Sequence, residues 1–257
     1  VVVRGLDANL NSVSIDGIAV VRFDRGDNIN ALSQQAMREL RDVPRDFEDD
    51  LETSVVILTG SAKAFSAGFD LKDPDGRARD GLPLGERRHR ARLGPKMCKA
   101  WQDMDQVTIA AVEGHCVGGG AALVVSLDFR TCGRSAHFRI PEIELGMNMS
   151  WGSIPRMLAL MGPARTKQAV ILASDRIDAA DALAWGLVEN VVEDGQALAA
   201  SMAFSVPSAL WPTATGFTVS LFCMPPSAAF RLLSASIRKL AATTTCSPSL
   251  TPSSTST

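Results

Sequence analysis

The chain has 257 residues, of which 46% are hydrophobic, so it can bury a substantial core and global disorder is excluded. Lysine and arginine number 26 and aspartate and glutamate 28, so the formal charge of −2 lacks the basic bias of nucleic-acid-binding proteins. Five cysteines without CxxC spacing and only three histidines lead us to expect neither a disulfide framework nor a metal site.

No apolar stretch reaches the ~20 residues that a membrane span requires. Residues 1–7 lack the basic head and the long apolar body of a signal peptide. We therefore expect a cytoplasmic protein that does not bind membranes.

The first quarter of the chain predicts two strands and one amphipathic helix. Residues 18–23 and 54–60 are rich in β-branched and aliphatic residues and are predicted strands. Ser33 is a candidate N-cap for a helix over residues 34–47. Pro44 interrupts that pattern, so we expect the helix to bend or to end early.

The next segment alternates polar loops with regular elements. Residues 63–72 are predicted to form a loop, and residues 73–85 a mobile polar segment that contains glycine. A cationic helix is expected over residues 86–104, followed by a strand over residues 107–112. Three consecutive glycines, residues 118–120, then turn the chain into a run of helix-forming residues.

Strands and helices continue to alternate after the glycines. The helix that they begin is expected to end near Asp128, and Asp178 and Gly186 are a candidate N-cap and a stop signal for a later helix. The further predicted elements are strands over residues 129–132, 137–141 and 187–192 and helices over residues 163–173 and 174–185. This alternation favours an α/β fold.

The character of the sequence changes beyond about Ser205, where prolines break every periodicity. We therefore divide the chain into a core of residues 1–200, a divergent helical or irregular region of residues 201–242, and a Ser/Thr/Pro tail of residues 243–257 that we expect to be disordered. Residues 228–242 could form a basic amphipathic helix. It is predicted to dock on the same protein rather than on a membrane surface.

Two glycine-containing turns carry the chemical prediction. Residues 64–72 and residues 118–120 each follow an apolar strand and offer an N–H beside a glycine, at Phe69 and at Gly119. If these N–H groups converge, they form an oxyanion hole, to which the helix that starts near Ala121 adds its positive end. Taken alone, a glycine triplet is more often structural.

Seven stretches together resemble the crotonase (enoyl-CoA hydratase/isomerase) superfamily over roughly residues 10–200. They are Asn30–Leu32, Val56–Gly60, Phe65–Lys72, Ile109–Gly114, Gly118–Gly120, Pro141–Gly146 and Ala182–Val188. Each is weak evidence by itself, but their order and spacing match those of the family.

The resemblance implies an α/β fold in which repeated ββα units coil into a spiral, with assembly into trimers or paired trimers. It also implies a thioester enolate mechanism on an acyl-CoA, with the N–H groups of Phe69 and Gly119 polarising the thioester carbonyl beside Gly118. Coenzyme A enters as part of the substrate, and no tightly bound cofactor is expected. CoA would lie along the first loop, with Ala67, Gly68 and Lys72 near its nucleotide end. For Lys72, a solvated surface charge is the alternative.

The resemblance also implies a role for Glu142 as the acid/base. In the family, a glutamate in this Pro-Glu-Ile stretch faces the acyl chain. Burial among Ile143, Leu145 and Trp151 would raise its pKa and allow it to pass a proton. The alternative is a loop glutamate that caps a helix or pairs with an arginine, either Arg139 or Arg156. The nearby Glu144 is expected to be structural.

Two departures from the family pattern change the expected activity. Ala122 stands where typical hydratases carry a second glutamate, which hydration normally requires, so isomerase-like or divergent activity is favoured over efficient hydration. Residues 147–152 replace a proline- and glycine-rich turn, and Asn148, Ser150 and Trp151 are expected to reshape the acyl pocket. Ordinary packing is the alternative for Trp151.

Residues 207–257 are a third departure, because family members usually finish with helices that close the site and build the trimer. The alternative functions are thioester or carbon–carbon bond hydrolysis on the same scaffold, and a catalytically silent relative that binds acyl-CoA or a partner protein.

His115 and Cys116 do not predict a catalytic dyad, because adjacent strand residues point to opposite faces. His89 is expected on a solvated helix face. His137 is expected to have no partner.

Overall fold

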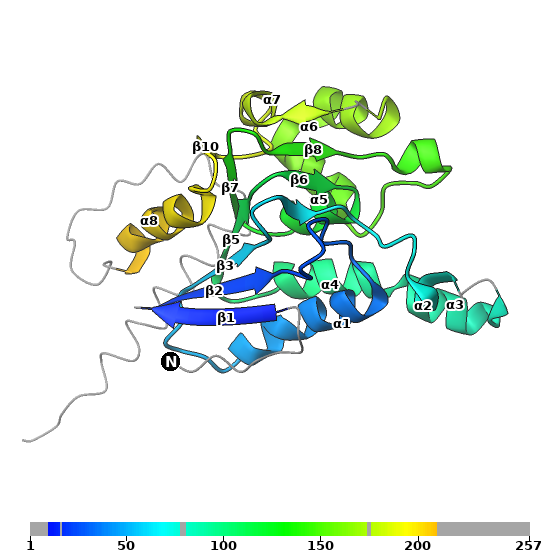
Figure 1. The fold of residues 1–257 in the computed structure, drawn as a ribbon, viewed down its shortest axis with the longest axis horizontal. Coiled ribbons are helices and arrows are strands. Elements are labelled where there is room, and N and C mark those ends of the chain that lie inside the picture. The colour runs from blue at the N-terminus through cyan, green and yellow to red at the C-terminus, as the bar shows by residue number, and fades with distance from the viewer. Residues whose placement is uncertain (1–9, 16, 78–80, 174–175, 210–257) are drawn as a thin grey trace, which may run out of the picture.

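The computed structural model describes residues 10–15, 17–77, 81–173 and 176–209. Its strands form two sheets (Figure 1). The six-stranded sheet has the order β1 (Leu10–Ile15), β2 (Ile18–Phe23), β3 (Val55–Thr59), β5 (Val107–Val112), β7 (Phe129–Gly133) and β10 (Asn190–Val192). The four-stranded sheet has the order β4 (Ala64–Ser66), β6 (His115–Val117), β8 (His137–Arg139) and β9 (Ile177–Asp178). Only the outer pairs β1–β2 and β8–β9 are antiparallel among these strands.

A ββα unit repeats along the chain. Strands β3, β5 and β7 of the large sheet are each followed by a strand of the small sheet, β4, β6 and β8, and then by helical structure. The helices are α1 (Gln34–Asp42), α2 (Pro74–Arg77), α3 (Leu84–Ala91), α4 (Leu93–Gln102), α5 (Gly119–Val124), α6 (Ser153–Ile171), α7 (Ala179–Ala184) and α8 (Ala197–Ala209), with the 3₁₀ helices η1 (Val43–Phe47) and η3 (Glu142–Leu145). The α/β prediction is confirmed.

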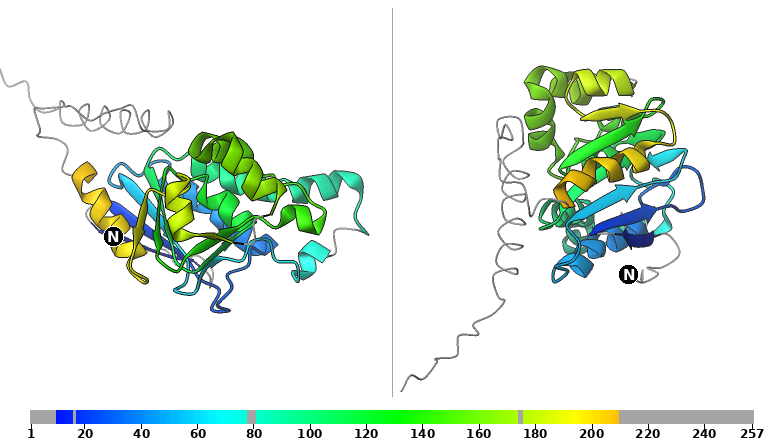
Figure 2. Two further views of the ribbon diagram at one scale, coloured as in Figure 1. Left: turned by 90° about the horizontal axis from the view of Figure 1, so that it is seen from above. Right: turned by 90° about the vertical axis from the view of Figure 1, so that its left-hand side faces the viewer.

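The large sheet is buried on both faces, as its apolar strands require. In β3, Val56 and Leu58 point to the core shared with α1, α4 and α5, whereas Val55 and Ile57 point to the opposite face. Helix α8 covers that opposite face and crosses the strands (Figure 2, right). Alternation with a period of two therefore builds two apolar layers around one sheet.

Local sequence patterns predicted where most of the helices and strands begin. Ser33 is the N-cap of α1, and its Oγ accepts a hydrogen bond of 3.2 Å from the N–H of Ala36. The helix predicted over residues 34–47 ends at Asp42, and η1 continues from there with Pro44 in its first turn. The helix predicted over residues 86–104 is two helices, α3 and α4, which meet at Arg92.

Other boundaries depended on tertiary structure and were predicted wrongly. The loop predicted over residues 63–72 contains β4, and the polar segment 73–85 contains α2. Helix α6 begins ten residues before the predicted Pro163, and Gly162, with a φ of 72°, kinks it just before that proline. Within residues 174–185, Ile177 and Asp178 form β9 before α7 starts.

Asp178 occupies the N-cap position of α7 without making a capping hydrogen bond, because its carboxylate pairs with Arg176. Residues 228–242 and the tail of residues 243–257 lie outside the described residues. In the part of the chain that is described, no helix is long and apolar enough to cross a membrane.

Candidate functional site

The two glycine-containing turns lie against each other. Strands β4 and β6 pair in parallel, so the loop after β4 and the glycine turn after β6 leave the same edge of the small sheet. A Cβ atom at Gly68 would lie 2.6 Å from the carbonyl oxygen of Val117 and 3.2 Å from the amide nitrogen of Gly119. Only glycine at position 68, where φ is +84°, lets the first loop approach the second this closely.

Backbone hydrogen bonds to Leu32 hold the first loop in place. The Leu32 N–H donates to the Gly68 carbonyl (2.7 Å), and the Asp70 N–H donates to the Leu32 carbonyl (3.0 Å). In this parallel bridge the intervening N–H of Phe69 points away from Leu32. Among the described residues, neither that N–H nor the N–H of Gly119, the first residue of α5, has a hydrogen-bond acceptor.

Each glycine of the triplet has a different close neighbour. A Cβ atom at Gly118 would lie 2.7 Å from Oε1 of Glu142, and one at Gly119 would lie 2.5 Å from Cζ3 of Trp151. A Cβ atom at Gly120 would lie 2.9 Å from the Cβ of Ser66. The triplet thus allows a carboxylate, an indole ring and strand β4 to contact one turn.

Glu142 is the first residue of η3, and its side chain is half-buried. Its Oε2 is buried and has no hydrogen-bond partner within the part of the chain that the structure describes. Burial raises the pKa of the Glu142 carboxyl group above its ordinary value of 4.5. A carboxylate with a raised pKa and a free oxygen is suited to accept and release a proton.

The two alternative arginine partners of Glu142 are engaged elsewhere. Arg139 pairs with Glu144 at 2.7 Å. The guanidinium of Arg156 donates to the carbonyls of Val125 and Ser126 at 3.4 and 3.3 Å. Arg139 is therefore the partner of Glu144, and pairing with Arg139 was wrong for Glu142.

The apolar surroundings predicted for Glu142 were partly wrong. Ile143 is 49% exposed and Leu145 is 52% exposed, so neither buries the carboxylate. The short 3₁₀ turn directs these side chains outward, and the contact with Gly118 places the carboxylate at the glycine turn instead.

Trp151 adopts a backbone conformation that is unusual for a bulky residue, with a φ of 59°. Its indole ring, which is partly buried, packs against Gly119 and also against Gly94 of α4. No sequence pattern singled out Gly94, which is one glycine inside a helix. Ser150 is exposed, and its carbonyl accepts hydrogen bonds from the N–H and the hydroxyl of Ser153 at the start of α6.

The remaining residues predicted to bind CoA line the first loop. The Ala67 N–H donates to the Ile29 carbonyl at 2.8 Å, which fixes the loop after β4. Lys72 is exposed, and its backbone N–H donates to Oδ1 of Asp70. Asp70 in turn pairs with Arg25 at 2.9 Å, and this contact contributes to the lowered pKa of the Asp70 carboxyl. Both explanations of Lys72 fit these contacts.

Ala122 is buried in α5 and brings no carboxylate to the turn. Cys116 is fully buried whereas His115 is exposed, so the two side chains lie on opposite faces as expected. Burial raises the pKa of the Cys116 thiol well above its ordinary value. His137 does have a partner, contrary to the prediction, because its Nε2 lies 2.9 Å from Nδ1 of His115 across the β6–β8 pair.

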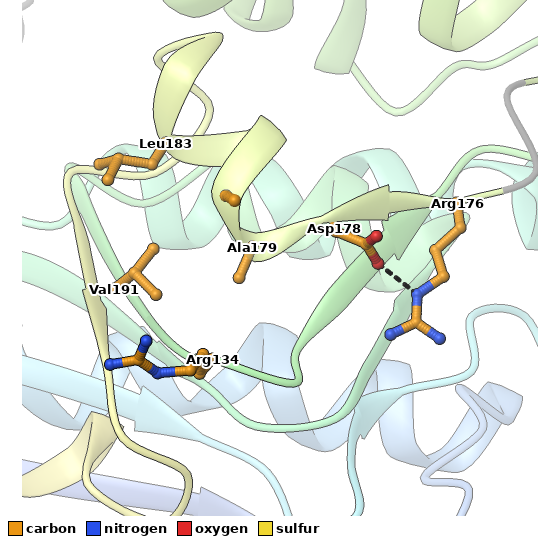
Figure 3. Close-up of a pocket in the computed structure, with 7 residues that line it drawn as sticks. Arg134, Arg176, Asp178, Ala179, Leu183 and Val191 are labelled. Atoms are coloured by element: carbon orange, nitrogen blue, oxygen red, sulfur yellow. Dashed lines mark hydrogen bonds and ion pairs between the residues drawn. The ribbon is translucent and has the colours of Figure 1, made fainter.

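A surface pocket of about 490 Å³ lies away from the glycine turn, between β9, α7 and β10 (Figure 3). Its two arginines already have acidic partners, since Arg176 pairs with Asp178 and Arg134 pairs with Glu193. None of the predicted site residues lines it.

Comparison with known sequences gives one consistent result. The sequence model of the family described as Enoyl-CoA hydratase/isomerase matches residues 14–205. A crotonyl-CoA hydratase of Syntrophomonas wolfei is 34% identical over 182 residues, which cover 70% of this chain and 68% of that protein. A carnitinyl-CoA dehydratase of Citrobacter koseri is 34% identical over 192 residues, which cover 70% of this chain and 69% of that protein.

Solved structures share the fold of this chain. The crystal structure of an enoyl-CoA hydratase from Bacillus anthracis is similar with a TM-score of 0.70 and 30% identity, covering 78% of this chain and 77% of that one. The structure of DspI from Pseudomonas aeruginosa is similar with a TM-score of 0.70 and 27% identity, covering 78% of this chain and 74% of that one.

Proposed function

The chain belongs to the enoyl-CoA hydratase/isomerase family, and we propose that within this family it moves a carbon–carbon double bond of an acyl-CoA thioester. It is an acyl-CoA enzyme of that family. The observation that carries the finer proposal is the position of Glu142. Its carboxylate contacts the glycine turn, beside two backbone N–H groups that have no acceptor among the described residues.

The N–H groups of Phe69 and Gly119 are the proposed oxyanion hole. They would donate to the thioester oxygen of the substrate, whose negative charge grows as the enolate forms. Removing one such donor typically costs about 2.7–4 kcal/mol of barrier, so a pair accounts for a large share of catalysis. The close approach of Gly68 to the Gly119 nitrogen supports a shared position for the oxygen.

Glu142 is the proposed acid/base. Its carboxylate takes a proton from C2 of a 3-enoyl-CoA, the C2–H electron pair becomes the enolate, and the double bond shifts from C3–C4 to C2–C3 as the same proton is returned to C4. No atom is gained or lost. A single carboxylate is sufficient for this transfer, and its raised pKa supports both halves of it.

The absence of a carboxylate at Ala122 supports isomerisation over hydration. Hydration in this family normally uses two carboxylates to hold and activate the water. Relatives of this chain are named hydratases and a dehydratase, so hydration is the competing activity to be measured.

The experiment compares crotonyl-CoA with a 3-enoyl-CoA as substrates of the purified protein. We expect isomerisation of the 3-enoyl-CoA to exceed hydration of crotonyl-CoA. Glu142→Gln should lower the isomerisation rate by about 10²–10⁴-fold, because the general acid/base is lost. Glu144→Gln is the matched control, since Glu144 lies two residues away in the same helix η3 and pairs with Arg139.

Each outcome has one interpretation. Efficient hydration of crotonyl-CoA would overturn the isomerase proposal, and unchanged turnover in Glu142→Gln would remove that residue from the mechanism. CoA binding without turnover of either substrate would identify a silent relative. Release of free CoA would identify a thioester hydrolase.

A further inference from the structure

We propose that Trp151 determines specificity by excluding acyl groups that branch next to the thioester, so that the substrates are straight-chain acyl-CoAs. This inference rests on the proposed function in one respect, which is the binding of the thioester carbonyl at the N–H of Gly119. The rest of the argument depends on the contacts of the indole ring with Gly94 and Gly119.

The indole ring occupies a slot between two helices, and each wall of the slot is a glycine. A Cβ atom at Gly94 of α4 would lie 2.1 Å from Cε2 and 2.4 Å from Cζ2 of the ring. A Cβ atom at Gly119 of α5 would lie 2.5 Å from Cζ3 and 2.6 Å from Cη2. Real Cβ atoms do not come this close, so the benzene portion of the ring spans the slot from α4 to α5 and fits only because both walls lack side chains.

Trp151 differs from a tryptophan that serves packing alone. Trp101, on the same helix as Gly94, is fully buried, and its indole N–H donates to the Leu40 carbonyl at 2.7 Å. Trp151 stays partly exposed and has a φ of 59°. A left-handed backbone at a bulky residue costs free energy and is characteristic of functional sites.

The ring also lies where an acyl group must pass. The ring edge that contacts Gly119 borders the residue whose N–H is the proposed donor to the thioester oxygen, so we expect the first carbons of the acyl group beside that edge. Cδ1 of Leu32 lies 3.3 Å from the same Cβ position, and Glu142 borders the neighbouring Gly118. The acyl C2 is therefore flanked by the indole, Leu32 and the carboxylate, and an extra methyl group at C2 meets the ring.

The experiment measures binding of butyryl-CoA and isobutyryl-CoA to the full chain by calorimetry. The two ligands are isomers, because the fourth carbon of the acyl group is the end of the chain in butyryl and a methyl branch at C2 in isobutyryl; 2-methylbutyryl-CoA, which keeps the full chain and adds the branch, is the third ligand and should bind as weakly as isobutyryl-CoA. We expect the native protein to bind butyryl-CoA at least about tenfold more tightly, the lower end of what one methyl group contributes to discrimination in an apolar pocket. Trp151→Ala should abolish this preference, and Trp151→Phe should reduce it.

An equal ratio of dissociation constants in the native protein and Trp151→Ala would overturn the inference, as would failure of both ligands to bind the native protein. Neither ligand has a double bond to move, so the measurement does not depend on turnover. Selective binding without isomerisation of a 3-enoyl-CoA would therefore overturn the proposed function and leave this inference standing.

Gly94→Ala tests the slot itself. In the native background the added methyl group collides with the ring, so we expect a lower unfolding temperature and loss of the butyryl preference. In the Trp151→Ala background the same change should be harmless. Gly85→Ala is the matched control, because Gly85 lies in helix α3 and its added Cβ would contact nothing within 4 Å. If Gly94→Ala is as harmless as Gly85→Ala in the native background, the slot does not hold the ring.

Discussion

Two buried carboxyl groups, one of Asp128 beside the large sheet and one of Glu142 at the glycine turn, differ in how their oxygens are hydrogen-bonded. The carboxylate of Asp128, the residue before β7, accepts hydrogen bonds from both the N–H and the hydroxyl of Thr108 in β5, at 3.0 and 2.9 Å. At the glycine turn, Oε2 of Glu142 and the N–H groups of Phe69 and Gly119 have no partner among the described residues. A buried polar group without a partner is costly, so we propose that a ligand supplies the missing contacts at the glycine turn.

The largest effect on stability is predicted for an ion pair of the large sheet. Arg130 in β7 is buried, and its guanidinium pairs with Glu189, which also accepts the Arg130 backbone N–H. Glu189→Ala would leave a buried cation without its counter-charge. We expect a loss of about 3 kcal/mol in the free energy of unfolding, at the lower end for a broken buried pair because Glu189 is partly exposed. Urea denaturation measures it.

The control for that prediction is Glu193→Ala. Glu193 pairs with Arg134 at the other end of β7, and both side chains are 71% exposed. Removing an exposed pair should cost less than about 1 kcal/mol. Equal losses in the two variants would mean that the burial of Arg130 does not set the cost.

The second prediction addresses the glycine turn. Gly118 has a φ of 51° and a ψ of −113°, and an added Cβ would lie 2.7 Å from Oε1 of Glu142. Gly118→Ala should cost about 1–3 kcal/mol of stability through backbone strain. It should also displace the carboxylate and lower isomerisation at least about a hundredfold, the effect expected when general acid/base catalysis is lost.

Gly146→Ala is the control that separates backbone strain from displacement of the Glu142 carboxylate. Gly146 has a comparable φ of 68°, but an added Cβ would contact nothing within 4 Å. It should therefore lose stability while keeping most of its activity. A similar loss of activity in both variants would show that the contact between Gly118 and Glu142 has no catalytic importance.

These two regions also differ in how much of them could be predicted from the sequence. Strands 18–23 and 107–112 were predicted to the residue, because apolar runs between turn residues specify buried strands. The crotonase-like fold class and the family were likewise predicted and are confirmed. Strand β4 was missed because three residues carry no periodicity, and only pairing with β6 makes them a strand.

The surroundings of the candidate site residues could not be predicted from the sequence. The contact of Glu142 with Gly118 joins η3 to a turn 24 residues earlier, and no local pattern encodes it. Ile143 and Leu145 were expected to bury Glu142 because they are apolar neighbours in sequence, yet the 3₁₀ turn exposes both. Gly94 lies in α4 and Trp151 lies just before α6, so the two residues meet only in the folded structure and their pairing could not be read from either position alone.

The third prediction concerns pH. Burial raises the pKa of Glu142 above 4.5, so the acid limb of the isomerisation profile should lie at higher pH than that of an ordinary glutamate. For stability, a raised folded-state pKa means that the native state binds more protons than the unfolded state between the two pKa values. The stability contributed by Glu142 therefore falls as pH rises through that window.

Glu142→Gln removes this titration, so the variant should gain stability relative to the native protein as pH rises from about 4 to 7. Thermal unfolding at a series of pH values measures the difference. A difference that stays constant with pH would show that the carboxyl group titrates normally in the folded protein.

The smallest effect is predicted for Lys72, an exposed residue of the first loop. Lys72 is exposed, so Lys72→Ala should change the free energy of unfolding by no more than about 0.5 kcal/mol. If its ammonium group binds the phosphates of CoA, the variant should bind CoA several-fold more weakly, and the deficit should shrink as salt screens the charge. Lys167→Ala, an exposed lysine on α6, is the control for net charge. Equal CoA affinity in both variants would restrict the site to the buried, unpartnered groups of the glycine turn and make Lys72 a solvated surface charge.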